Sequence, residues 1–115
     1  MARFNYLELP VRDVAAAKAF YAAAFGWTFT DFGPDYASTM SGDTDLGLNG
    51  DADQATAQLL PVIEVEDLQA AEASVRAAGG EVTLPIFAFP GGRRFHFRDP
   101  AGHELSAMQG DPAGG

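Results

Sequence analysis

The chain has 115 residues, of which 47% are hydrophobic, and this size suits one compact domain with a single core. Its formal net charge of −9 repels phosphate backbones and anionic membrane surfaces, so we expect neither nucleic acid nor membrane as a partner. The absence of cysteine excludes disulfides, thiolate nucleophiles and cysteine-ligated metals together. No apolar run is long enough for a membrane span or a leader peptide, so we expect a soluble, cytoplasmic protein.

The first half of the chain is typical of a strand and a helix followed by three short strands. Residues 4–11 alternate between apolar and polar side chains, which predicts a half-buried strand. Asp13 takes the N-cap position of a predicted helix that ends at Gly26. The apolar stripe of this helix is Val14, Ala17, Tyr21, Ala24 and Phe25. Turn-forming residues separate three further predicted strands, which are 27–32, 36–40 and 46–49.

The second half repeats this pattern. The segment from Val11 to Gly26 recurs without a gap from Val65 to Gly80, and the apolar positions keep one register. A unit that cannot bury its face alone must pack on its copy or on another chain. We expect two βαβββ modules, residues 4–50 and 59–109, joined by a linker at 51–57 and followed by a flexible tail at 110–115.

The elements of the second module are predicted in the same way. A strand at 59–65 precedes a helix that is capped by Asp67 and ends at Gly79 and Gly80. Pro85 lies within the strand pattern at 81–89 and indicates an edge strand or a bulge. A tight turn at 99–102 then joins the last two predicted strands, which are 93–98 and 103–109.

Strand alternation predicts which side chains share a face of the sheet. The residues expected beneath the two helices are Leu7, Leu9, Val11, Phe95, Phe97, Leu105 and Ala107. The opposite face then gathers Tyr6, Glu8, Arg94, His96, Glu104, Ser106 and Met108. This mixture is too polar for a sealed core and too aromatic for a bare surface, so we expect a concave ligand pocket.

Several motifs, taken together, resemble those of the vicinal oxygen chelate superfamily, which includes glyoxalase I, bleomycin-resistance proteins, extradiol dioxygenases and fosfomycin-resistance enzymes. The resemblance covers nearly the whole chain. It rests on residues 8–13, 20–21, 25–27, 65–68, 78–80, 92–93 and 97–105. It implies an α+β fold in which two tandem βαβββ modules form a curled mixed sheet, or cup. The family cup is usually completed in a homodimer and often holds a divalent metal.

The metal site is where the chain departs from the family. Enzymatic members place His, Gln or Glu on the inward faces of the first and last strand of each module. Alignment puts these positions on Tyr6, Leu60, Ser106 and either Gly47 or Asn49. None of these is a strong ligand for a first-row divalent metal. We therefore expect no metal and no other cofactor, with a displaced metal site near His96 and Glu104 as the alternative.

The candidate site residues each have a functional and an ordinary interpretation. Glu8 could orient a ligand or act as a general base, or be a solvated carboxylate. His96 and Glu104 could form an acid–base pair or simply share a hydrogen bond. Arg94 could contact an anionic or carbonyl-bearing ligand, or pair with Glu8 or Glu104. The predicted ligand-binding set is Tyr6, Glu8, Trp27, Tyr36, Arg94, His96, Glu104, Ser106 and Met108, and the catalytic candidates are Glu8, His96 and Glu104.

These residues leave three functions open. The first is a metal-independent small-molecule-binding protein with a pocket for an aromatic, amphipathic or cationic ligand, assembled as a homodimer. The second is a metal-dependent, glyoxalase-like lyase or isomerase that acts on a vicinal-oxygen substrate through a relocated site. The third is a dimeric interaction module whose pocket is vestigial. The fold is shared by all three, so only the site can distinguish them.

Overall fold

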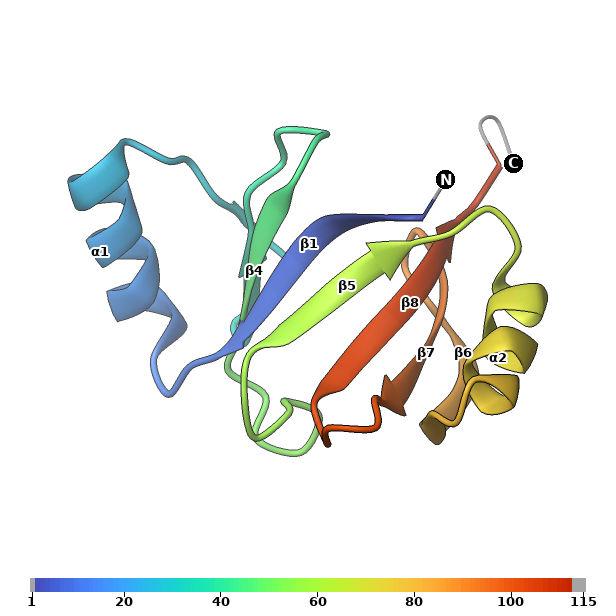
Figure 1. The fold of residues 1–115 in the computed structure, drawn as a ribbon. Coiled ribbons are helices and arrows are strands. Elements are labelled where there is room, and N and C mark those ends of the chain that lie inside the picture. The colour runs from blue at the N-terminus through green and yellow to red at the C-terminus, as the bar shows by residue number, and fades with distance from the viewer. Residues whose placement is uncertain (1, 113–115) are drawn as a thin grey trace. The chain divides into compact units, whose positions relative to one another are not determined.

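The protein has an α+β fold built from two βαβββ modules, as the computed structural model in Figure 1 shows for residues 2–112. The chain divides into two compact units, one of residues 5–60 and one of residues 61–112 with 2–4. Each unit contains one helix and a mixed sheet of parallel and antiparallel strands. The repeated module order predicted from the internal repeat is thus confirmed.

The first unit contains β1 (Arg3–Pro10) from residue 5 onward, α1 (Val14–Phe25), β2 (Thr30–Asp31), β3 (Tyr36–Ser38) and β4 (Asp45–Asn49). Its strands are ordered β2-β3-β4-β1. β1 and β4 are parallel, whereas β3 runs antiparallel to both of its neighbours. The central position of β4 places its residues between those of β1 and β3, and this order determines the geometry of the polar face described below.

The ends of α1 follow the sequence signals. The Asp13 side chain accepts a hydrogen bond of 3.0 Å from the Ala16 amide, and Gly26 adopts a left-handed φ of 73°. Such caps satisfy helix-end groups that have no intrahelical partner. Beneath the helix, a core cluster forms from Val14, Ala37 and Leu48, with Leu9, Val11, Ala17, Tyr21, Phe29 and Leu46 packed against it.

Two expectations for this unit were wrong. The strand predicted at 27–32 is reduced to the two residues of β2. Of the predicted helix stripe, the first three residues reach the core, but Ala24 and Phe25 do not. Phe25 is 61% exposed and Trp27 is 43% exposed. The reason is that the rings of Tyr21, Phe25 and Trp27 stack on one another, so residue 27 packs against α1 instead of entering the sheet. Leu7, at 39% exposure, also lies outside the core cluster.

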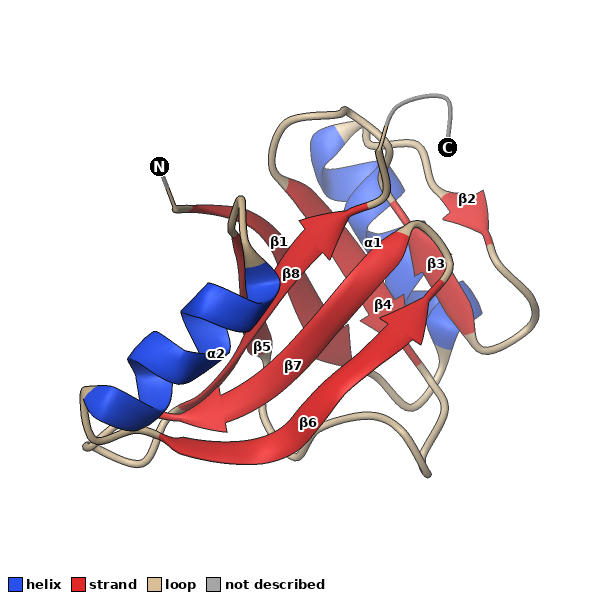
Figure 2. Ribbon diagram, turned by 90° about the vertical axis from the view of Figure 1, so that its right-hand side faces the viewer, coloured by secondary structure: helices blue, strands red, loops and turns tan. Residues whose placement is uncertain are grey.

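The second unit contains β5 (Leu60–Glu64), α2 (Leu68–Ala77), β6 (Glu81–Phe89), β7 (Gly92–Arg98) and β8 (Glu104–Gly110). Its strands are ordered β5-β8-β7-β6, and Figure 2 shows α2 beside the long antiparallel strands of this sheet. The core beneath α2 consists of Leu68, Phe95 and Ala107, with Val65, Ala71, Val75, Val82, Ile86 and Phe97 against it. β6 is an edge strand whose register shifts on both sides of Leu84, close to Pro85, as predicted.

The helix of the second unit has two N-terminal hydrogen-bond acceptors. Asp67 accepts from the Ala70 amide at 3.0 Å, which confirms the predicted cap. Gln109, on β8, accepts a further bond of 2.9 Å from the Leu68 amide. This second acceptor is 41 residues away in sequence, and sequence analysis did not predict it. It ties the start of α2 directly to the sheet.

The described part of the chain ends in contact with the β6–β7 turn. Gly110 is the last residue of β8, and the Asp111 amide donates a 2.9 Å hydrogen bond to the Gly91 carbonyl. Residues 113–115 of the predicted tail lie outside the described residues. Within residues 2–112, neither helix has the length and apolar character that crossing a bilayer requires.

Candidate functional site

The polar face of the first unit is built around a glycine. On β1, Glu8 lies directly opposite Gly47 of β4, and Ser38 of β3 flanks Gly47 on the other side. The side chains of Tyr6 and Tyr36 extend over Gly47, because a Cβ atom there would meet both hydroxyl oxygens inside van der Waals contact distance. Glycine at this position therefore makes the room in which two phenols from different strands meet.

Three side chains on this face form a chain of hydrogen bonds. The Tyr36 hydroxyl donates to Glu8 Oε1 at 2.8 Å, and its oxygen lies 2.5 Å from the Tyr6 hydroxyl oxygen. Glu8 is only 3% exposed. Burial, reinforced by the negative charge of Glu8, raises the pKa of Tyr36 far above its usual value, so this phenol stays protonated. The predicted site residues Tyr6, Glu8 and Tyr36 are thus brought together.

The polar face of the second unit lies on β7 and β8. His96 is paired with Ser106, and Arg94 is paired with Met108. Phe95 and Ala107 alternate with these residues and are buried in the core beneath α2. The predicted division between core and polar faces is therefore present on both strands. This face carries five predicted site residues, which are Arg94, His96, Glu104, Ser106 and Met108.

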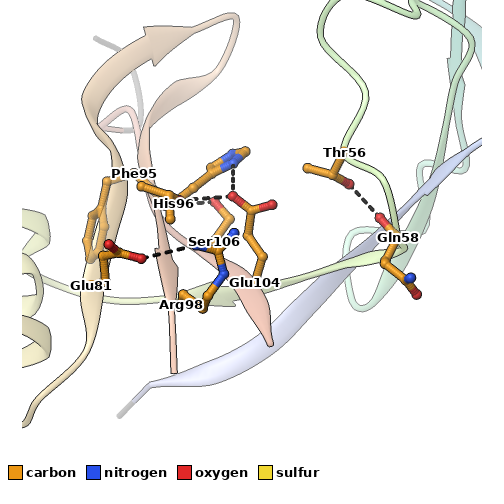
Figure 3. A network of polar contacts seen from close by, with 9 residues as sticks. Thr56, Gln58, Glu81, Phe95, His96, Arg98, Glu104 and Ser106 are labelled. Atoms are coloured by element: carbon orange, nitrogen blue, oxygen red, sulfur yellow. Dashed lines mark hydrogen bonds and ion pairs between the residues drawn. The ribbon is translucent and has the colours of Figure 1, made fainter. Parts of the chain in front are cut away.

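His96 and Glu104 approach one another on this face, as Figure 3 shows. Their Nδ1 and Oε2 atoms are 3.8 Å apart, which is longer than a direct hydrogen bond. Thr83 of β6 donates a 2.9 Å hydrogen bond to the same carboxylate oxygen. Ser106 Oγ donates to the Phe95 carbonyl oxygen at 3.1 Å, so its proton is used within the sheet. Thr83 was not among the predicted site residues, because the irregular register near Pro85 obscures which β6 residues face Glu104.

Arg94 lies among aromatic rings. Its guanidinium carbon is 5.3 Å from the ring centroid of Phe87 and 5.3 Å from that of Phe89. The His96 ring is 5.7 Å from the same Phe87 ring. Guanidinium groups at such distances are attracted by the negative faces of aromatic rings. The arrangement offers flat apolar surface next to a positive charge, and neither predicted interpretation of Arg94 included it.

Two other residues take no part in these faces. Trp27, one of the predicted ligand-binding residues, stacks on Tyr21 and Phe25 of α1, and Tyr21 packs against the core on the helix side of the sheet. His103 is exposed and pairs with Asp99, its Nδ1 lying 3.2 Å from the carboxylate. Hydrogen bonds from the backbone of residue 103 lower the pKa of Asp99.

The positions where enzymatic relatives hold a metal do not fit one here. Leu60 is fully buried, Gly47 has no side chain, and the Asn49 side-chain oxygen accepts from the Asp51 amide. Ser106 and Tyr6 carry hydroxyls that are engaged in hydrogen bonds. Across residues 2–112, no three His, Asp or Glu side chains lie close enough together to hold a metal ion. Such a metal would need imidazole or carboxylate ligands that these positions lack.

Paired βαβββ modules, each with a polar face opposite its helix, define the glyoxalase-like class of proteins. The model of the Glyoxalase/Bleomycin resistance protein/Dioxygenase superfamily matches residues 3–106, and the chain belongs to this superfamily. The family resemblance seen in the sequence motifs is confirmed.

The chain is similar to two curated mycobacterial proteins, both named "Putative glyoxylase CFP32", from Mycobacterium bovis and Mycobacterium tuberculosis. Identity is 32% over 119 residues, and the match covers 91% of this chain and 44% of each relative. The chain thus spans less than half the length of these relatives.

Solved structures share the fold at low sequence identity. Methylmalonyl-CoA epimerase from Mycobacterium tuberculosis superposes with a TM-score of 0.75 at 14% identity, covering 96% of this chain and 89% of that chain. The Mn(II)-bound glyoxalase from Novosphingobium aromaticivorans gives 0.71 at 23% identity, covering 95% of this chain and 40% of that chain. At such identities the likeness concerns the fold alone.

Proposed function

We propose that the chain is a small-molecule-binding member of the superfamily that holds an aromatic, amphipathic or cationic ligand without a metal. One observation carries the proposal. Where enzymatic relatives place metal ligands, the first unit has Tyr6, hydrogen-bonded through Tyr36 to the buried carboxylate of Glu8. Binding by hydrogen bonds and stacking needs no catalytic group, so this arrangement suits capture of a ligand better than metal-assisted chemistry.

The composition of both polar faces supports a ligand. Burying a carboxylate or an imidazole costs free energy, and a sheet face that served stability alone would be apolar. Glu8 and His96 are each 3% exposed, and each lies on the face opposite its unit's helix. Phe87, Phe89 and Met108 add flat or adaptable apolar surface beside Arg94. The net charge of −9 favours cationic ligands over long range.

The test is a binding panel on protein purified without a chelator. Thermal shift and calorimetry would measure cationic and aromatic metabolites and antibiotics, with and without EDTA, alongside elemental analysis. We expect saturable binding that EDTA does not change, because no step depends on a metal. A stoichiometric, tightly held divalent metal would contradict the proposal. An unchanged melting temperature across the whole panel would favour an interaction module instead.

A second candidate function rests on the approach of His96 to Glu104. An imidazole 3.8 Å from a carboxylate can exchange protons with a substrate after a small rearrangement. We therefore keep proton transfer on a vicinal-oxygen substrate as the alternative, with Glu8 as a further candidate base. Turnover of an α-oxo substrate that is lost in Glu104→Gln or Glu8→Gln would establish it. Turnover that survives both substitutions would exclude Glu104 and Glu8 as the groups that transfer the proton.

We also propose that the chain forms a homodimer through the outer face of α1. The helix carries a single charged residue, Lys18, and Val14 is its only buried residue. Phe20, Phe25 and Trp27 remain 60%, 61% and 43% exposed and are joined by ring contacts through Tyr21. Complete burial of an aromatic side chain removes roughly 150–250 Å² from water, and about half of this remains to be covered on each of the three rings, so the rings and the exposed alanines supply a substantial part of the ~800 Å² per partner of a stable interface.

The low charge of the outer face of α1 favours a second copy of this chain as its partner. Two chains of charge −9 repel one another, and a face with almost no charge is where they can meet at least cost. Light scattering at several concentrations should show a dimer that Phe25→Glu dissociates. Leu59→Glu, at an exposed apolar residue outside the ring cluster, is the matched control. A monomer at all concentrations would refute this assembly.

A further inference from the structure

Asn49, the last residue of β4, and Gly50 form a dipeptide that can react with itself. The Gly50 amide nitrogen can attack the Asn49 side-chain carbonyl carbon, because glycine has no Cβ atom to hinder the approach. A C–N bond forms, the side-chain nitrogen leaves as ammonia with the amide proton, and a succinimide ring remains. Water then opens this ring to aspartate or isoaspartate. Apart from water, the two residues supply every atom that reacts.

The fold engages both reacting groups in other contacts. The Gly50 amide donates a 2.8 Å hydrogen bond to the Asp35 carbonyl oxygen. The Asn49 side-chain oxygen accepts a 2.9 Å bond from the Asp51 amide, and Asn49 is only 6% exposed. β4 is paired on one side with β1 and on the other with β3. The extended backbone of a strand also holds the next amide nitrogen away from the side chain, so ring closure requires this end of β4 to open.

The packing of the first unit requires this reactive pair. A Cβ atom on Gly50 would lie 2.8 Å from Cγ2 of Val14, which belongs to the core beneath α1. A larger residue at position 50 would therefore overpack the core. The Asn49 side chain in turn holds the Asp51 amide at the start of the following loop, a role typical of asparagine. Both residues thus have structural reasons to be present, although their order is chemically labile.

We propose that Asn49 is a deamidation site that opens only when the first unit unfolds, and that its conversion to isoaspartate then prevents this unit from refolding. Isoaspartate routes the main chain through the former side chain and adds one carbon to it. This displaces the Asn49 carbonyl, which accepts a 2.9 Å bond from the Val11 amide, and the Gly50 amide that donates to Asp35. Chemical change of the unfolded chain makes unfolding irreversible.

A comparison of folded and unfolded protein tests the site. Both samples would be incubated in mildly alkaline buffer, one with guanidinium chloride, and peptide mapping by mass spectrometry would follow each asparagine. Asn5, the other asparagine of the chain, is the internal reference, because the Tyr6 side chain hinders attack by the next amide. In guanidinium we expect Asn49 to react at least about tenfold faster than Asn5. Folding should slow Asn49 at least about tenfold, because only opened molecules react.

Either of two results would overturn the proposal. Equal rates at Asn49 in folded and unfolded protein would show that the fold gives no protection. A rate at Asn49 no higher than at Asn5 in guanidinium would show that the dipeptide is not a deamidation site.

Two proline variants test whether the Asp35 carbonyl contributes to this protection. Pro34→Gly loosens the turn that carries this carbonyl and should accelerate deamidation of the folded protein severalfold. Pro100→Gly loosens the turn at 99–102 in the second unit and is the matched control, with a rate close to that of the unchanged chain. Melting curves would confirm that both variants are folded. Equal rates in the two folded variants would contradict protection by this hydrogen bond.

Refolding tests the consequence of the modification. The unchanged chain would be held in guanidinium for increasing times and then diluted, and its recovery should fall in step with isoaspartate at residue 49. Asn49→Ser cannot form the ring, and its hydroxyl can still accept from the Asp51 amide. Recovery of this variant, relative to its own value at the earliest time, should not fall. Full recovery of isoaspartate-containing protein would refute the block on refolding. These results do not depend on ligand binding, so the proposed function is tested separately.

Discussion

Tyr36, on β3, donates a hydrogen bond to Glu8 on β1 although β4 lies between these two strands. Neighbouring strands are about 4.8 Å apart, so the bond spans roughly two strand spacings. A tyrosine side chain is long enough to do this only where the intervening strand presents no side chain. Gly47 provides that gap, and the polar face of the first unit depends on it.

Alkaline pH should destabilise the protein through Tyr36. Burial and the charge of Glu8 raise its pKa in the folded chain, whereas the unfolded tyrosine ionises near pH 10. The contribution of protonated Tyr36 to the free energy of unfolding is fully present below about pH 10. As the pH rises further, this contribution falls by up to about 1.4 kcal/mol per pH unit. Urea denaturation between pH 9 and about 11 should show a shallower decline for Tyr36→Phe. Equal slopes for Tyr36→Phe and Tyr21→Phe would disprove the assignment.

Gly47→Ala should disrupt the polar face of the first unit. The added methyl group would overlap the hydroxyl oxygens of Tyr6 and Tyr36, and one phenol must move. Overpacking of this kind costs about 1–3 kcal/mol of unfolding free energy. The control is Gly110→Ala, where the nearest atom to a new Cβ is 3.8 Å away. Similar denaturation midpoints for the two variants would show that residue 47 tolerates a side chain.

Gln109→Ala should destabilise the second unit by about 1 kcal/mol, because the Leu68 amide would lose the acceptor that β8 supplies. Hydrogen exchange at the Leu68 amide should accelerate in the variant, which distinguishes a lost cap from general loosening. Gln69→Ala changes an exposed glutamine on the same helix and should alter stability by less than about 0.5 kcal/mol. Unchanged exchange at Leu68 would rule out the cap.

The two repeated helix caps should contribute equally. Asp13 and Asp67 have nearly identical backbone angles, with φ of −137° and −138°, and each accepts from the third residue after it at 3.0 Å. Replacing either by alanine should cost about 1 kcal/mol in chemical denaturation. Asp53→Ala, in the segment between the modules, is the control and should have little effect. A cost at one cap alone would show that the repeat is no longer equivalent.

Much of the fold was predictable because its signals are local. The helix starts at Val14 and Leu68 follow from aspartate side chains that reach amides three residues ahead. The irregularity of β6 near Pro85 follows from an imide nitrogen that cannot donate to a sheet. Alternation on β7 correctly separated Phe95 from His96 because successive side chains of a strand point to opposite faces.

The amino-acid sequence by itself determined the repeated module, its helix caps and the alternation of polar and apolar faces, since each depends on residues a few positions apart. Only the tertiary structure decided that Tyr36 reaches Glu8, that Trp27 packs on α1 and that Gln109 caps α2. These contacts depend on which strands pair and in what register. Register is set by packing summed over a whole sheet, and no short stretch of sequence encodes it.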